Sequence, residues 1–390
     1  MHGVEVLNRV ERVETCKELG DREIVNILVV ASGNPESAGT WSGVPCRVVT
    51  ELRRLGHCVV CGDFSNVWWI KPWRVAYNRF LCRHFRVFKC KSFMATRFGI
   101  QLNSLWLKHL LRRRKDIDLV VAMSFCFNGK NLGKPLFLVH DWTIGYLRAL
   151  FGDREIGPED VDIDAPAFDA MRYAKKVVSL YPKSAEYMKS HIGECVSYIC
   201  NPINVDTSAD MGARIDAARE SRHVLVVGGA VYRRNVETVL MAADRLGISD
   251  VVVDVVGCSD VSYKPVNATV RFHGYLDRAK PNDGQLYDSL FMSARCFVNV
   301  RKGWCGGSSV AEALYRGVPV VVSRNPEIEC LYGECPAVSL VEPENVAALA
   351  ERLRVILLKE DREYEAMCRA AHDLTANDTY AKFVGEIVGG

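Results

Sequence analysis

Short runs of β-branched and aliphatic residues alternate with longer segments of helical periodicity along most of the chain. In the first half these runs predict strands at Val25–Ala31, Val59–Gly62, Leu119–Ala122, Leu136–Val139 and Lys176–Leu180. After Asn201-Pro202 a second series predicts strands at Val224–Val227, Val251–Val256, Thr269–Phe272, Cys296–Val300, Val318–Val322 and Ala337–Leu340. Strands that alternate with helices are typical of a parallel sheet covered on both faces. The sequence therefore predicts an α/β protein with two successive doubly wound domains.

The two strand series set the expected domain boundaries. We expect an N-terminal extension over residues 1–24, an N-terminal Rossmann-like domain over 25–202, a C-terminal Rossmann-like domain over 203–374 and a C-terminal helix over 375–390. The polar stretch Asp206–His223 has no clear strand and is expected to join the domains. Ligands of parallel sheets bind at the carboxyl ends of the strands, so two facing sheets would create one cleft between the domains.

Composition narrows the class of protein. The 390 residues are 49% hydrophobic and 25% charged, as in a folded protein that dissolves in water. Met1–Asp21 lacks the apolar core of a signal peptide, and the longest apolar runs have the length of strands rather than of membrane helices. We therefore expect a cytoplasmic protein.

A glycine-rich turn separates a predicted strand from a predicted helix in the C-terminal domain. It runs from Gly303 to Gly307, and Ser308 or Ser309 can cap the helix that contains Glu312. The unpaired N–H groups at such a helix start suit a phosphate, and glycines let a ligand approach the backbone closely. Taken alone, the pattern also fits a plain strand-to-helix turn with Glu312 in solvent.

This segment resembles the nucleotide-binding motif of family 4 glycosyltransferases, because Gly307, Glu312-Ala313 and Gly317–Val320 match it in order and spacing. Val226–Asn235 is similar to the family's phosphate loop, and Asn201-Pro202 is similar to its hinge. Phe272–Tyr275 resembles the strand end that comes before a helix, which is expected to begin near Gln285 here. Gly39–Gly43 is similar to the family's opening loop. The resemblance covers roughly residues 25–358 and is strongest in the C-terminal half.

The resemblance implies a GT-B fold, in which two Rossmann-like domains face each other across a cleft. It also implies transfer from a nucleotide sugar, such as a UDP- or GDP-sugar, with retention of configuration and without a metal or other cofactor. The implied donor-binding residues are Gly228, Gly229, Arg233, Arg234, Gly274, Tyr275, Trp304, Gly306, Gly307, Ser308, Ser309 and Glu312. In this comparison Arg234 would contact the donor diphosphate, and Glu312 would accept hydrogen bonds from ribose.

Two positions depart from the family pattern. Trp304 stands where the family has the first of two glutamates, and Gly229 stands where many members have arginine. The lost glutamate normally contacts the transferred sugar. One alternative is therefore a nucleotide-sugar-binding protein on the same fold without catalytic activity.

Two segments of the N-terminal domain follow predicted strands. His140 and Asp141 come directly after an apolar strand and are candidate catalytic residues, as hydrogen-bond acceptor or proton carrier in the cleft. The alternative is a helix N-cap by Asp141 with His140 packed beside it. The candidate acceptor loop consists of Gly39, Thr40, Trp41, Ser42 and Gly43, and its alternative is a plain flexible loop.

The segment Lys71–Lys115 contains thirteen Lys or Arg residues and no acid, with interleaved aromatic residues. It could contact the anionic headgroups of a membrane at the inner face, or it could be a solvated helix face over apolar stems. The third alternative is a nucleic-acid-associated glycosyltransferase, although nucleic acid is the less favoured partner.

We therefore predict a glycosyltransferase that moves a sugar from a nucleotide sugar to a glycan, a lipid-linked acceptor or another acceptor. We expect no metal site, because no acidic D-x-D string lies beside a nucleotide loop, and Asp162-Ile163-Asp164 is expected in a polar connection instead.

Overall fold

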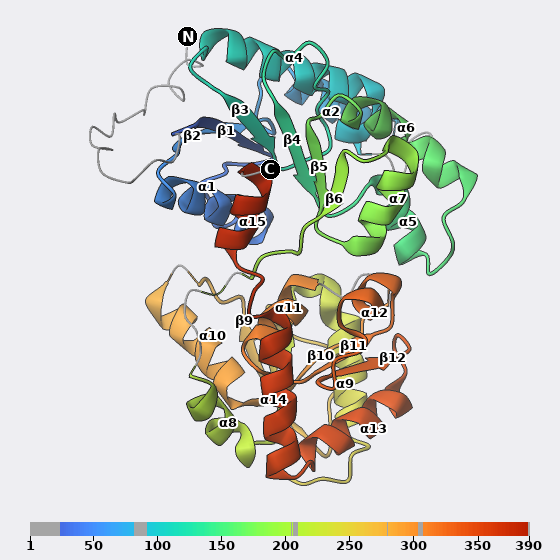
Figure 1. Ribbon diagram of the computed structural model, residues 1–390. Coiled ribbons are helices and arrows are strands. Elements are labelled where there is room, and N and C mark those ends of the chain that lie inside the picture. The colour runs from blue at the N-terminus through green and yellow to red at the C-terminus, as the bar shows by residue number, and fades with distance from the viewer. Residues whose placement is uncertain are drawn as a thin grey trace.

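The computed structural model describes residues 24–81, 92–203, 205, 210–278, 280–302 and 307–388. Two six-stranded parallel sheets form two domains, one above the other in Figure 1. This is the predicted fold class. The N-terminal extension lies almost wholly outside the described residues.

The first sheet has the order β2-β1-β3-β4-β5-β6. Its strands are β1 (Asn26–Ala31), β2 (Cys58–Asp63), β3 (Leu119–Ala122), β4 (Leu136–His140), β5 (Lys176–Ser179) and β6 (Val196–Tyr198). One face packs on α1 (Val44–Arg54) and α15 (Tyr380–Val388), and the other packs on α4 (Arg97–Arg113), α6 (Pro158–Met171) and α7 (Pro182–Ile192). Both faces are covered, which explains why the central strands are continuous apolar runs. Two shorter helices, α2 (Lys71–Ala76) and α5 (Ile144–Phe151), complete this domain's main elements.

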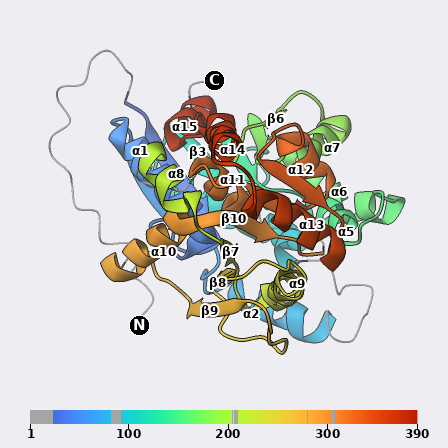
Figure 2. The same cartoon turned by 90° about the horizontal axis from the view of Figure 1, so that it is seen from below.

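The second sheet has the order β12-β11-β10-β7-β8-β9. Its strands are β7 (His223–Val227), β8 (Val252–Val256), β9 (Thr269–Gly274), β10 (Ala294–Asn299), β11 (Val320–Ser323) and β12 (Val338–Val341). On one face lie α9 (Arg233–Ala243) and α13 (Val346–Leu357). On the other lie α8 (Met211–Arg219), α10 (Pro281–Ser293), α11 (Gly307–Tyr315) and α14 (Asp361–Thr375) (Figure 2). Helix α12 (Pro326–Tyr332) precedes β12.

The chain crosses between the domains twice, after β6 and after α14. The two crossings are bonded to each other, because Ile203 N donates to Asp378 O at 2.9 Å and the Cys200 thiol donates to Asp378 Oδ2 at 3.2 Å. After the second crossing, α15 packs on α1 beneath the first sheet (Figure 1). Its buried residues Phe383, Val384 and Ile387 belong to the N-terminal core.

Each strand that the sequence predicts is present, with ends shifted by a few residues at most. The prediction omits β6, whose three residues are too few for a periodic pattern. The polar joint contains a helix, α8, and α10 begins at Pro281 rather than near Gln285. Proline at the first position of α10 fits a helix start, so the earlier boundary has a local cause.

Candidate functional site

A cavity of about 310 Å³ lies between the two domains. From the N-terminal domain it is lined by Trp41, Ser42, Val44, Asp141, Trp142, Leu180 and Tyr181, with Asn201 from the first crossing. From the C-terminal domain it is lined by Val227, Gly228, Tyr232, Gly307, Ser308 and Ser309. The cavity therefore brings together parts of the candidate acceptor loop, one candidate catalytic residue and part of the candidate donor site.

The acceptor loop has a strained backbone at the cavity. Trp41 and Ser42 have φ values of 43° and 55°, and Gly43 follows with φ of 84°. Among the described residues, Trp41 and Ser42 are the one consecutive pair of non-glycine residues with positive φ. Each such residue costs about 1–3 kcal/mol, and strain of this kind concentrates at functional sites. The strained turn places the Trp41 indole against His140, with ring centroids 5.0 Å apart and the planes nearly parallel.

Asp141 follows β4 directly and lines the cavity. Burial raises the pKa of its carboxyl to about 7, against the opposing effect of a hydrogen bond from the Trp41 indole. Its carbonyl oxygen accepts a hydrogen bond from Ser179 Oγ at 2.7 Å, which fixes the backbone at the end of the strand. The helix-cap alternative is wrong, because α5 begins at Ile144 and its N-cap residue is Thr143. Near neutral pH this carboxyl can hold or release a proton.

His140 lies behind Trp41 rather than among the residues that line the cavity. Its ring is also 5.4 Å from that of Phe125, so it is enclosed by aromatic side chains. Burial lowers the pKa of the imidazole to about 4, and the ring is therefore neutral at physiological pH. The Nδ1 atom is buried and has no hydrogen-bond partner among the described residues.

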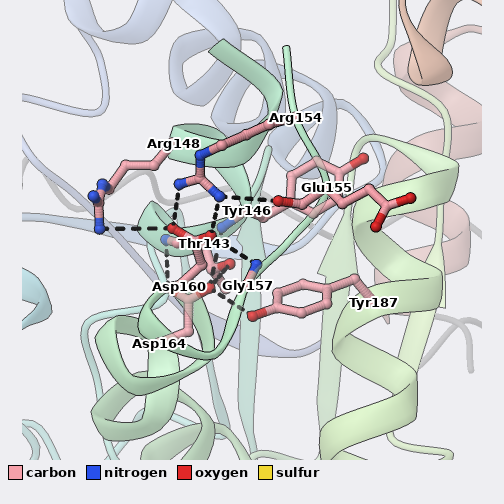
Figure 3. Close-up of polar contacts among 10 residues, drawn as sticks. Thr143, Tyr146, Arg148, Arg154, Glu155, Gly157, Asp160, Asp164 and Tyr187 are labelled. Carbon is pink, nitrogen blue, oxygen red and sulfur yellow. Dashed lines mark hydrogen bonds and ion pairs between the residues drawn. The ribbon is translucent and has the colours of Figure 1, made fainter. Parts of the chain in front are cut away.

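Two buried carboxylates support the segment after Asp141 (Figure 3). Asp164 accepts hydrogen bonds from Thr143 Oγ1 at 2.5 Å and from the backbone N–H groups of Gly145 and Tyr146 at 2.7 and 3.2 Å. It therefore accepts from backbone N–H groups at the start of α5 that have no partner within the helix. Asp160 is fully buried and holds Arg154 through two hydrogen bonds of 2.6 and 2.9 Å.

The expectation that Asp162-Ile163-Asp164 lies in a polar connection is wrong. The string lies inside α6, and Asp164 faces the interior because helix periodicity turns it toward α5. Among the described residues no group of three or more His, Cys, Asp or Glu side chains could hold a metal ion. No helix in the described part of the chain is long and apolar enough to cross a membrane.

The donor side of the cavity begins at Gly228, directly after β7. A Cβ atom at Gly228 would lie 2.4 Å from Cγ of Tyr232, so only glycine allows this ring to pack there. Gly229 has open space around its Cα, but it is not among the residues that line the cavity. Tyr232 also lines the cavity and was not predicted from the sequence, although an aromatic residue in a glycine-rich loop directly after a strand is a signal for it.

Helix α11 supplies Gly307, Ser308 and Ser309 to the cavity. Asn201 Nδ2 donates a hydrogen bond of 2.7 Å to Ser308 Oγ, which connects the first crossing to the candidate donor site. The candidates Trp304 and Gly306 lie outside the described residues. The position of Asn201 agrees with the hinge motif that the sequence suggested.

Glu312 lies one turn further along α11 and is only 6% exposed. Its carboxylate accepts hydrogen bonds from Tyr287 Oη at 3.1 Å, and from the guanidinium groups of Arg278 and Arg316 at 3.4 Å each. Burial raises its pKa in spite of these two cations. Glu312 does not line the cavity, so its proposed contact with ribose stays a prediction.

The basic donor candidates point to partners outside the cavity. Arg233 pairs with Asp260 at 2.8 Å, and Arg234 pairs with Glu344 at 3.2 Å. Gly274 ends β9 with φ of +65°, and Tyr275 is 81% exposed. None of these four residues lines the cavity, nor do Gly39, Thr40 and Gly43 of the acceptor loop.

Glu327 of α12 connects the domains and was missed by sequence reasoning. It is fully buried and accepts hydrogen bonds from Tyr146 Oη at 2.6 Å and from the N–H groups of Ser184 and Lys183 at 2.8 and 3.0 Å. Burial raises the pKa of its carboxyl. The sequence Asn325-Pro326-Glu327 signals a helix start, but not a partner in the other domain.

Comparisons with known proteins give a family match for part of the chain and similar solved structures for most of it. Residues 221–359 match the family described as glycosyl transferases group 1, and no curated protein matches the chain. The structure is similar to a glycosyltransferase from Rickettsia africae ESF-5, at 13% identity and a TM-score of 0.59 over 94% of this chain and 99% of that one. It is also similar to sucrose-phosphate synthase from Thermosynechococcus elongatus, at 14% identity and a TM-score of 0.61 over 94% and 97% of the two chains.

MurG from Acinetobacter baumannii is a further similar structure, at 14% identity and a TM-score of 0.55 over 94% of this chain and 100% of that one. At these identities the structures establish the fold. The chain therefore has the two-domain GT-B fold, and its residues 221–359 match the family described as glycosyl transferases group 1.

Proposed function

We propose that the protein transfers a sugar from a nucleotide-sugar donor to an acceptor in the cavity between its domains. One observation carries this proposal: Trp41 and Asp141 of one domain face Gly228 and Ser308 of the other across the same cavity. The match of residues 221–359 to a glycosyltransferase family supports it, since this is the half that supplies the candidate donor site.

The two sides of the cavity suit different parts of the reaction. The glycine and serine side, with the start of α11, offers a close approach, hydroxyl groups and backbone N–H donors to a diphosphate. On the other side, Asp141 with a pKa near 7 can accept a hydrogen bond or a proton from an acceptor hydroxyl. His140, being neutral, can pair with a sugar hydroxyl if Trp41 moves aside.

The family resemblance supports three finer parts of the proposal. The anomeric configuration is retained, the donor is a UDP- or GDP-sugar, and neither a metal nor another cofactor takes part. Backbone N–H groups and a basic side chain would stabilise the departing diphosphate. Activity should then survive a metal chelator, and NMR of the product should show the donor's anomeric configuration.

The deciding experiment measures release of nucleoside diphosphate from a panel of UDP- and GDP-sugars, with and without glycan or lipid-linked acceptors. Wild-type protein should release it, and Asp141→Asn should release far less. Tight donor binding with no release under any acceptor condition would instead establish the alternative, a nucleotide-sugar-binding protein without catalytic activity.

We also propose that the basic segment Lys71–Lys115, with its interleaved aromatic residues, contacts anionic lipid at the inner membrane face, where a lipid-linked acceptor would be presented. The support is the exposure of large aromatic side chains within this basic segment: Trp73 is 54% exposed and Phe80 59%. Helix α4 ends in Arg112 and Arg113, and a basic side chain near an anionic surface contributes about 1 kcal/mol. Residues 82–91 of this segment lie outside the described residues.

Vesicle binding tests this surface. Wild-type protein should bind vesicles that contain anionic lipid, less so as salt rises, and replacement of Arg112 and Arg113 by Gln should weaken binding. Equal binding to neutral and anionic vesicles, or none, would favour a solvated face. Preferential binding to oligonucleotides would favour the nucleic-acid alternative.

A further inference from the structure

The strands β7 and β10 lie side by side in the second sheet, and the chain continues from them in opposite directions. From β7 it continues to β8 and β9, and from β10 to β11 and β12. Ligands of open α/β sheets bind outside the carboxyl ends of the strands at such a divergence. Gly228 follows the end of β7, and Arg301 is the second residue after β10. Arg301 therefore lies at the edge of this sheet where a ligand is expected to bind.

The guanidinium group of Arg301 lies over the ring of Tyr232, 5.0 Å from its centroid. The same ring lines the cavity and packs on Gly228. Stacking restrains a guanidinium group through its face, while its N–H groups lie in the plane and remain able to meet an anion. The guanidinium group is thus held on a ring that lines the cavity, while Arg301 itself is not among the lining residues.

The backbone just before Arg301 is fixed by two hydrogen bonds of Val300. Val300 N donates a buried hydrogen bond of 2.7 Å to the Asn235 side chain, and Val300 O accepts one of 3.2 Å from Glu344 N. A side chain that starts from a restrained backbone loses less freedom when it binds a ligand. Arg301 is also half-buried, whereas Arg234 has a side chain that is 78% exposed.

Charge pairing separates Arg301 from the other arginines at this end of the sheet. Arg233 and Arg234 each pair with a carboxylate, Asp260 and Glu344 respectively. Within the described ranges, Arg301 has no carboxylate partner. An anionic ligand that met Arg234 would compete with Glu344, but one that met Arg301 would have no such competitor in that part of the chain.

We propose that Arg301, stacked on Tyr232, binds the diphosphate of the donor nucleotide and does what the sequence comparison assigned to Arg234. This inference rests on the proposed function, since it assumes a nucleoside-diphosphate donor. A guanidinium group fits phosphate oxygens with two parallel hydrogen bonds, which a lysine in its place would not make.

The test compares the affinities of UDP and GDP with those of uridine and guanosine, by calorimetry or by protection against thermal unfolding. Arg301→Gln should weaken binding of the preferred diphosphate at least tenfold and leave its nucleoside within twofold. Arg301→Lys should recover part of the loss, because it restores charge without the planar fork. Lys302→Gln removes the same charge from the exposed neighbouring residue and should change neither affinity by more than twofold.

Arg234→Gln is the competing variant. If it loses discrimination between diphosphate and nucleoside while Arg301→Gln keeps it, the assignment to Arg301 is wrong and that to Arg234 is right. Equal affinities for wild type and Arg301→Gln would also overturn the inference while leaving the proposed function intact. If wild-type protein binds neither UDP nor GDP, the proposed function fails and this inference fails with it. Unchanged thermal unfolding without ligand checks that each variant is folded.

Discussion

The two domains share one architecture but line the cavity with different kinds of residue. Each is a six-stranded parallel sheet covered by helices on both faces. The N-terminal domain contributes the strained Trp41 and the buried acid Asp141, whereas the C-terminal domain contributes Gly228, Gly307 and Ser308. The sheet determines where a ligand can bind, and the few residues after each strand determine what happens to it. We infer that the C-terminal side holds the donor and the N-terminal side holds the chemistry.

The largest expected effect comes from Asp141→Asn, which keeps the shape of the side chain and removes its ability to take a proton. Release of nucleoside diphosphate should fall about 10²- to 10⁴-fold, the usual range for a lost acid or base. Nucleotide affinity should stay within twofold, because the donor contacts are assigned to the other domain. An equal fall in nucleotide affinity would break the proposed division between the domains.

Glu327→Ala tests the connection between the domains rather than either side of the cavity. The change leaves the Tyr146 hydroxyl and two backbone N–H groups without their acceptor in a buried place. We expect a loss of about 2–3 kcal/mol in the free energy of unfolding, measured with denaturant. Tyr146→Phe in the Glu327→Ala background should cost little more, because the two side chains act as a pair. Additive losses would show that Glu327 and Tyr146 act independently.

Gly228→Ala tests whether the donor side of the cavity depends on the close packing of the Tyr232 ring against the backbone of Gly228. The added Cβ would lie 2.4 Å from the Tyr232 ring, so the ring has to move. We expect about 1–2 kcal/mol of destabilisation from this overpacking, together with weaker nucleotide binding. Gly229→Ala is the matched control, because its Cβ would meet no atom within 4 Å. Similar effects at both positions would contradict a specific role for the Tyr232 ring.

The smallest expected effect comes from Trp41→Phe, which keeps a ring against His140 but removes the indole N–H. That N–H donates to Asp141 and favours its carboxylate, so the variant should have a higher Asp141 pKa. If the carboxylate is the active form, wild-type turnover rises with pH through about 7 and the variant's profile moves to higher pH. Turnover at pH 6.5 should fall about twofold to fivefold. A shift of the variant's pH profile to lower pH would show that the Trp41 hydrogen bond raises the Asp141 pKa instead of lowering it.

The sequence predicts most of this fold because the pattern that makes a buried parallel strand is local. An apolar run between polar turns, as at Leu136–Val139, needs no knowledge of the rest of the chain. Where the pattern is short or mixed, as at β6 and α8, local information is not enough. The Asp162–Asp164 string shows the same limit, since only packing against α5 reveals that Asp164 is an interior acceptor.

The candidate site was predictable in part for the same reason. Asp141 and Gly228 follow strands, so topology alone places them at the cavity. Arg234 and Glu327 depend on partners distant in sequence, and Glu327 lies 181 residues from Tyr146. Charge and spacing cannot reveal whether an arginine is already paired, so the sequence could not show that Arg234 has Glu344 as a partner.

Helix α15 has a consequence for how the protein is made. Phe383, Val384 and Ile387 complete the core beneath the first sheet, although more than 170 residues of the other domain separate α15 from β6. During synthesis, the part of α1 and of this sheet face that α15 covers therefore stays open until α15 has been translated. Domains usually fold as units in the order of translation. Here the core of the N-terminal domain is completed only after the C-terminal domain has been translated, and a nascent chain halted before Tyr380 would expose apolar surface to chaperones and proteases.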